Sequence, residues 1–127
     1  MARILNAALA TGVAGLIIAA GPPPVSNDAV QGQKVFQQNC ALCHSVVAGR
    51  RANGPSLFGI VGRKSGSVEG YPYSSAMKAS GLSWTSAQLR TYIGSPRKIV
   101  PGTKMAFAGM TDPHKVEPLL AYLNSLK

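Results

Sequence analysis

The sequence predicts an all-α fold in which helices are separated by loops rich in glycine and proline. Apolar residues recur at the helical spacings of three and four along several segments. No run of strictly alternating apolar and polar residues is long enough for a β-sheet. The 127 residues suffice for one domain and would hardly fill two.

The first twenty residues differ in composition from the rest of the chain. Arg3 is their only charged residue, and an uncharged, mainly apolar run follows over residues 4–20. This pattern is typical of an export signal, and the run is short for a membrane-spanning helix, which needs about 20 residues. We expect residues 1–20 to be a cleaved export signal or an uncleaved membrane anchor, and residues 21–27 to be a proline-rich spacer. Both alternatives place the remainder in the periplasm.

The first helix is predicted to begin at Asp28, with Gln31 three residues later in the position of a capping box. Its spacing places several apolar or small residues on one face, namely Ala29, Gly32, Phe36, Cys40 and Cys43. A short second helix is predicted over residues 75–80. Gly81 ends it, because glycine readily adopts the left-handed conformation found after helices.

A third helix is predicted between Thr85, which forms a capping box with Gln88, and the Gly-Ser-Pro sequence at residues 94–96. Residues 94–110 are predicted to be a loop, because prolines and glycines interrupt any periodicity.

The last helix is predicted over residues 113–126, capped by Asp112, and its apolar residues are Val116, Leu119, Leu120 and Leu123. Because Pro118 would lie in its interior, we expect a kink there, or a helix that starts near Pro118.

The predicted helices offer little apolar surface for a core. The chain contains 14 glycines and 9 prolines, which add to the entropic cost of folding and contribute little packing. We therefore expect a group other than side chains to fill the centre of the molecule.

The sequence Cys40-Ala41-Leu42-Cys43-His44 is the Cys-x-x-Cys-His signature of covalent haem attachment. Cysteines three apart on a helical turn face the same way, so both thiols can add to one porphyrin while the next imidazole ligates the iron. The same dithiol spacing also occurs in thioredoxin-type redox sites and in zinc sites. A thioredoxin-type dithiol needs a strand before the motif, where a helix is predicted, and a zinc site needs two further ligands, for which His114 is the only remaining histidine.

Residues 28–127, which include this motif, resemble the class I cytochromes c, in the mitochondrial-like subgroup that includes bacterial members. The matching motifs are Gly32-x-x-x-Phe36, Gly54-Pro55, Gly62-Arg63-Lys64-x-Gly66, Tyr73, Gly81-Leu82-Ser83-Trp84, Tyr92, Pro101-Gly102-Thr103-Lys104-Met105 and Leu119-x-Ala121-Tyr122-Leu123.

The resemblance implies the cytochrome c fold, with three main helices and several short ones around one haem c bound through Cys40 and Cys43. It implies a one-electron carrier that is not an enzyme and that shuttles electrons between membrane redox complexes by Fe(II)/Fe(III) cycling. His44 and Met105 are the implied axial ligands. The alternative is a peroxidase-like haem enzyme, which would require an open sixth position on the iron.

Further roles follow from the resemblance alone. The Pro55 carbonyl would accept a hydrogen bond from the His44 ring, and the Tyr92 hydroxyl would reach the ligand sulfur. Tyr73 and Trp84 would donate to a haem propionate, and Arg63 would lie beside the propionates. Two other methionines, Met77 and Met110, are expected to be packing residues.

Three departures from the family pattern stand out. Met77 occupies a position that is often asparagine, which implies a less polar pocket. The segment between His44 and Pro55 is about one residue shorter than in mitochondrial members. Pro118 is unusual in the last helix. None of these departures involves the implied ligands.

Thirteen basic against four acidic residues give a formal net charge of +9, so a macromolecular partner is expected to be acidic. We expect a monomer that docks onto a bc-type complex, a terminal oxidase or a photosynthetic reaction centre. The basic residues expected around the haem edge are Lys34, Arg50, Arg51, Arg97, Lys98 and Lys104. A nucleic-acid ligand is not expected, since aromatic residues are not interleaved with the basic ones and the chain is exported.

Overall fold

The computed structural model describes Gly15, Gly21 and residues 26–127. The predicted signal or anchor and most of the predicted spacer lie outside the described residues. Within the described part, no helix is long and apolar enough to cross a membrane.

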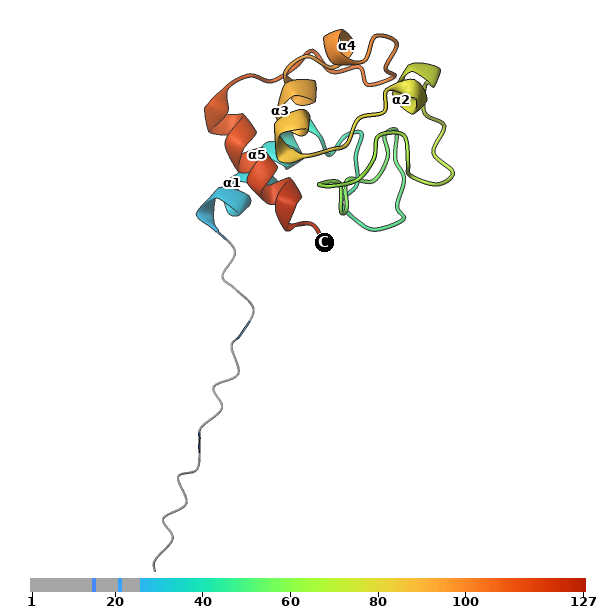
Figure 1. Cartoon of the computed structure of the whole chain (residues 1–127). Coiled ribbons are helices and arrows are strands. Elements are labelled where there is room, and N and C mark those ends of the chain that lie inside the picture. Colours follow the sequence, from blue (N-terminus) through green and yellow to red (C-terminus); the bar gives the residue numbers. More distant parts are fainter. Residues whose placement is uncertain (1–14, 16–20, 22–25) are drawn as a thin grey trace, which may run out of the picture.

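The described residues form the expected all-α fold, with five helices and one isolated bridge between Lys64 and Ser83. The helices are α1 (Asn27–Asn39), α2 (Ser75–Ala79), α3 (Ser86–Gly94), α4 (Pro96–Ile99) and α5 (Pro113–Ser125). Figure 1 shows α1, α3 and α5 grouped on one side, with long loops and α2 on the other.

Helix α1 begins slightly earlier than predicted. The Ser26 hydroxyl, rather than Asp28, caps it by accepting a hydrogen bond from the Ala29 amide at 3.2 Å. Asp28 lies in the first turn, where its negative charge interacts favourably with the positive end of the helix dipole. The helix ends at Asn39, and the Cys40 carbonyl then accepts hydrogen bonds from the amides of Cys43 and His44. The haem-attachment motif is therefore a tight turn on the end of α1.

Helices α1 and α5 cross at very short range. A β-carbon at Gly32 would overlap the Pro118 carbonyl, and the rings of Phe36 and Tyr122 lie 5.8 Å apart. Leu119 on α5 is only 1% exposed. The two ends of the described domain are thus joined at this crossing.

The alternative start of the last helix near Pro118 is wrong, because α5 begins at Pro113 and is continuous through Pro118. The Asp112 carboxylate caps it by accepting from the His114 amide at 2.9 Å. Pro118 removes one amide hydrogen bond, to the carbonyl of His114. Since His114 is exposed, water can satisfy that carbonyl, and the helix tolerates the loss.

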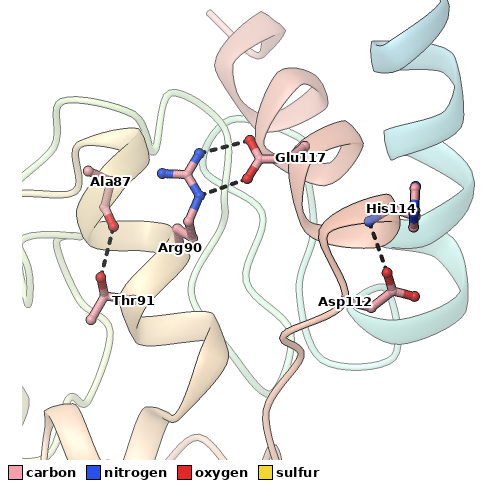
Figure 2. Close-up of polar contacts among 6 residues, drawn as sticks. All are labelled: Ala87, Arg90, Thr91, Asp112, His114 and Glu117. Carbon is pink, nitrogen blue, oxygen red and sulfur yellow. Dashed lines mark hydrogen bonds and ion pairs between the residues drawn. The ribbon is translucent and has the colours of Figure 1, made fainter.

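Helix α3 follows the prediction closely, with Thr85 accepting from the Gln88 amide at 3.1 Å. Arg90 of α3 donates two hydrogen bonds of 2.8 Å to the carboxylate of Glu117 on α5 (Figure 2). This is the one salt bridge among the residues that the structure describes. Both side chains are about half exposed, so solvent screens the attraction, and its main effect is to orient α3 against α5.

The prediction that residues 94–110 are entirely loop is wrong for residues 96–99, which form α4. Pro96 stands in the first turn, where its missing amide proton costs nothing, and it is fully buried. Helix α2 agrees with the prediction to within a residue, and Gly81 follows it with a φ of 65°.

Candidate haem site

The ring of His44 is held by the hydrogen bond that the resemblance implied. Its Nδ1 lies 2.8 Å from the Pro55 carbonyl oxygen. Because a carbonyl can only accept, Nδ1 carries the proton, and Nε2 keeps a lone pair for a metal. Burial lowers the pKa of His44, more than the Pro55 hydrogen bond raises it, and the charge of Arg63 lowers it further. The imidazole is therefore held in the neutral form that ligates iron.

Gly54 provides the surface against which the His44 ring packs. A β-carbon at position 54 would collide with the ring atoms of His44, so only glycine fits there. The Gly54 amide also donates to the Cys43 carbonyl at 2.7 Å, which ties this segment to the attachment motif. The sequence resemblance included Gly54 but gave no reason for it. The close approach to the imidazole is that reason.

The two cysteines of the motif, the only ones in the chain, lie at the end of α1 and are not joined by a disulfide bond. Cys40 is partly buried and Cys43 is exposed. Burial, and secondarily the neighbouring Cys43, raise the pKa of Cys40 to about 11. Cys40 and Cys43 stand on the same turn at the end of α1, which is the arrangement that attachment to one porphyrin needs.

Met105 differs from the other described methionines in its burial. Met77 and Met110 are each 8% exposed and belong to the central cluster of buried residues, as expected for packing residues. Met105 is partly exposed and lies in an irregular segment. Met105 is thus the least buried of the three methionines within residues 26–127.

The Tyr92 hydroxyl, expected to reach the ligand sulfur, has a threonine as its partner in the structure. Its hydroxyl pairs with Thr103 Oγ1 at 2.8 Å and makes no hydrogen bond to the Met105 sulfur among the described residues. Thr103 Oγ1 also accepts from the Met105 amide at 3.3 Å. Since Thr103 is two residues before Met105 in a tight loop, it lies between the phenol and the Met105 backbone. Thr103 was missed as a site residue, because a threonine in a loop carries no distinctive pattern.

The segment that carries Met105 is closed at its base by two glycines. Gly109 adopts a φ of 118°, and a β-carbon there would overlap the Gly94 carbonyl. The Met110 amide donates to the Ile93 carbonyl at 2.9 Å. Residues 94–109 therefore leave and re-enter the fold at one point, between α3 and α5.

Two hydrogen-bond donors expected near a haem propionate keep their protons available. The Tyr73 hydroxyl oxygen accepts from the Val68 amide at 3.2 Å, and its own proton is not used in that bond. Trp84 is 6% exposed. Its indole N–H donates to no group within the described residues, and its nitrogen keeps some contact with solvent. Both groups can therefore donate to an acceptor that the side chains do not supply.

Arg63 binds backbone carbonyl groups, in addition to the place beside the propionates that the resemblance implied. Its guanidinium donates to the Ser56 carbonyl at 2.8 Å and to the Phe58 carbonyl at 3.0 Å. Burial lowers the pKa of Arg63, and the guanidinium stays protonated. Arg63 thus fixes the segment that follows Pro55, and three of its five N–H groups remain for other partners.

These residues fit haem c better than either alternative. A porphyrin needs two thiols, a nitrogen ligand of fixed tautomer and donors for its propionates, and the residues described above supply each of them. Among the described residues, no group of three or more His, Cys, Asp or Glu could hold a metal ion, which leaves the zinc alternative without support. A helix rather than a strand precedes the dithiol, which argues against a thioredoxin-type site.

Comparisons with known proteins agree with this assignment. The family model for cytochrome c matches residues 29–127. The chain is 50% identical over 105 residues to a cytochrome c2 of Rhodopila globiformis, covering 83% of this chain and 97% of that protein. It is 46% identical over 114 residues to a cytochrome c2 of Blastochloris viridis, covering 87% and 89%. The solved structure of cytochrome cH from Methylobacterium extorquens superposes with a TM-score of 0.72 at 44% identity, covering 78% of this chain and 99% of that one.

Proposed function

This chain belongs to the cytochrome c family, and we propose that it transfers electrons between membrane redox complexes in the periplasm with His44 and Met105 as axial ligands of its haem. Haem c is bound covalently through Cys40 and Cys43, and the protein is an electron carrier rather than an enzyme. The observation that carries the ligand assignment is the contrast between two methionines packed in the core and Met105, which is partly exposed in a closed loop.

When bound, the haem supplies a one-electron Fe(II)/Fe(III) couple, and the residues of this chain set its properties. The His44 imidazole, fixed by Pro55, offers a neutral nitrogen. The thioether of Met105 is a soft ligand that favours the ferrous state and so raises the reduction potential. With His44 and Met105 both bound to the iron, no position would remain open for a substrate.

The remaining residues retain and shield the cofactor. We assign Tyr73 and Trp84 as donors to a propionate, because each has an uncommitted proton. Arg63 contributes positive charge from a backbone-anchored position. Tyr92 acts through Thr103, which fixes the backbone of Met105.

Docking onto acidic surfaces accounts for the charge of the chain. All four acidic residues are described, and two of them, Asp112 and Glu117, already interact with α5 or α3. Arg97 and Lys98 on α4 are exposed, and they make no side-chain hydrogen bond within the described residues. They precede Met105 in the same loop. We therefore propose that they attract an acidic partner to this side of the molecule.

The periplasmic location rests on the composition of residues 1–20 and on the relatives named cytochrome c2. Haem attachment to a Cys-x-x-Cys-His motif, in a chain that starts with a signal-like segment, supports the same location.

Carbon monoxide binding to the reduced protein tests the ligand assignment. Met105→Ala opens one axial position, so the ferrous protein should bind carbon monoxide, and its reduction potential should fall. Met77→Ala and Met110→Ala are the matched controls and should do neither. Carbon monoxide binding by the wild type, or by a control as readily as by Met105→Ala, would contradict the assignment and favour a haem enzyme.

A further inference from the structure

Residues 70–72 make hydrogen bonds with two separate segments of the chain. Gly70 and Pro72 each accept one through their carbonyl oxygens, and Tyr71 donates one through its hydroxyl. The three partners belong to two segments that are far apart in the sequence. These are residues 51–53, which precede the support of the His44 ring, and Lys104, which directly precedes Met105.

One set of contacts faces the segment that holds His44. The Tyr71 hydroxyl donates to the Asn53 carbonyl at 2.8 Å, and the Arg51 guanidinium donates to the Gly70 carbonyl. Asn53 is followed directly by Gly54 and Pro55, which pack against and hydrogen-bond the imidazole. Movement of residues 70–71 would therefore displace Asn53, and with it Gly54 and Pro55, which support the proposed nitrogen ligand.

The opposite contact reaches the loop of the proposed sulfur ligand. Lys104 Nζ donates to the Pro72 carbonyl at 2.6 Å. This bond joins residues separated by 32 positions, and its donor is the residue next to Met105. A charged donor makes such a bond shorter and stronger than a neutral one.

The segment between these contacts is internally braced. The rings of Tyr71 and Tyr73 meet edge to face, with centroids 4.7 Å apart. The Tyr73 amide donates to the Tyr71 carbonyl at 3.0 Å, and the Val68 amide donates to the Tyr73 hydroxyl oxygen. Because these contacts brace the segment from within, a displacement at Pro72 should also move Tyr71 and Gly70.

We infer that residues 70–72 are a clamp that mechanically couples the two axial-ligand segments, and that Lys104 is the positioning residue that restrains the Met105 loop. The inference rests on the proposed ligation by Met105 and extends it to the question of what keeps the thioether in place. Lys104 and Arg51 are thereby committed to the fold, although the sequence grouped both with the docking charges.

The rate at which imidazole displaces the methionine ligand from the ferric holoprotein tests the clamp. At saturating imidazole, this rate reports how often the Met105 loop opens. Lys104→Met removes the donor and should raise the rate about three- to tenfold, the value of one partly exposed charged hydrogen bond. Lys104→Arg keeps a donor and should restore most of the wild-type rate. Lys78→Met removes an equal charge from an exposed lysine on α2 and should leave the rate unchanged.

Amide hydrogen exchange gives a second readout that does not depend on ligand exchange. In Lys104→Met, the amides of Thr103 and Met105 should exchange about three- to tenfold faster, while those of Leu119 and Leu120 in α5 should not change. Equal acceleration everywhere would indicate global destabilisation and overturn the positioning role.

Lys104 and Tyr71 share no hydrogen bond. Energetic coupling between substitutions at these two residues would therefore distinguish a clamp from two independent local contacts. Tyr71→Phe releases the segment from Asn53. If the segment transmits force, Lys104→Met should then have a smaller effect than in the wild type. Strictly additive effects on the imidazole rate would overturn the inference. A wild-type protein without a methionine-ligated ferric spectrum would instead contradict the proposed function itself.

Discussion

The backbone of Gly32 on α1 touches the carbonyl group of Pro118 on α5 with no space between them for a β-carbon. The β-carbon of Tyr122 closes the same gap, at 2.7 Å from the position that a Gly32 β-carbon would occupy. The crossing of the two helices is therefore set by the absence of a side chain at one position. This contact brings the start of the haem-attachment helix to the end of the chain.

Gly32→Ala should destabilise the folded protein by about 1–3 kcal/mol, because the added methyl group forces the helices apart. The gain in helix propensity, about 1 kcal/mol, is too small to offset that overlap. Gln33→Ala, at an exposed position of the same helix, is the control and should change stability little. Denaturant unfolding of the holoprotein measures both, and a stabilised Gly32→Ala variant would mean that the helices can separate freely.

Removal of both attachment cysteines should leave the chain unfolded. The side chains alone supply a small core, so Cys40→Ala with Cys43→Ala should yield a protease-sensitive polypeptide without helical packing. In the wild type, haem should remain with the polypeptide in a denaturing gel, because thioether bonds hold it. A double variant that folds normally without haem would contradict the view that the cofactor completes the core.

The rate of association with a redox partner should fall steeply as salt is added. Steering by exposed charges weakens as the Debye length shrinks from roughly 30 Å at about 0.01 M salt to about 8 Å at 0.15 M. The expected fall is about tenfold or more for a purified reaction centre or terminal oxidase, measured by stopped-flow or flash kinetics.

Neutralising Arg97 and Lys98 together should flatten this salt dependence and leave the visible spectrum unchanged. These residues suit the test better than Lys104, whose ammonium group is bonded to Pro72. A wild-type rate that does not depend on salt would assign the basic residues to solubility alone.

The mass of the purified protein decides the fate of residues 1–20. A mature chain that starts at or after Gly21 is the outcome expected of a cleaved export signal. An intact amino terminus recovered in the membrane fraction would establish the anchor instead.

The sequence predicted best those elements whose signals are local. Thr85 and Gln88 marked the start of α3 correctly, since a capping side chain and its amide partner lie within one turn. The Cys-x-x-Cys-His motif is equally local. Helix α4 was missed because a single turn beginning at Pro96 has no periodicity, and the full burial of Pro96 is visible only in the folded structure.

Features that depend on tertiary contacts escaped prediction. Pro118 argued for an interruption of α5, yet the helix continues because packing against α1 outweighs one lost hydrogen bond. The pairing of Tyr92 with Thr103, and the anchoring of Lys104 to Pro72, join residues 11 and 32 positions apart. Such pairs can be identified only when the loops are seen folded together.

The joined base of residues 94–109 separates the length of this loop from the positions of the two helices beside it. Because Gly94 and Gly109 meet and Met110 bonds to Ile93, the two ends of the loop are fixed to each other. Inside the loop, the buried Val100 and the Lys104 bond to Pro72 tie it to the rest of the fold. A loop whose ends are already in contact adds little closure entropy when its interior changes in length or composition. Exposed residues of this loop, such as Ala106 and Ala108, can therefore change while α3 and α5 stay as they are.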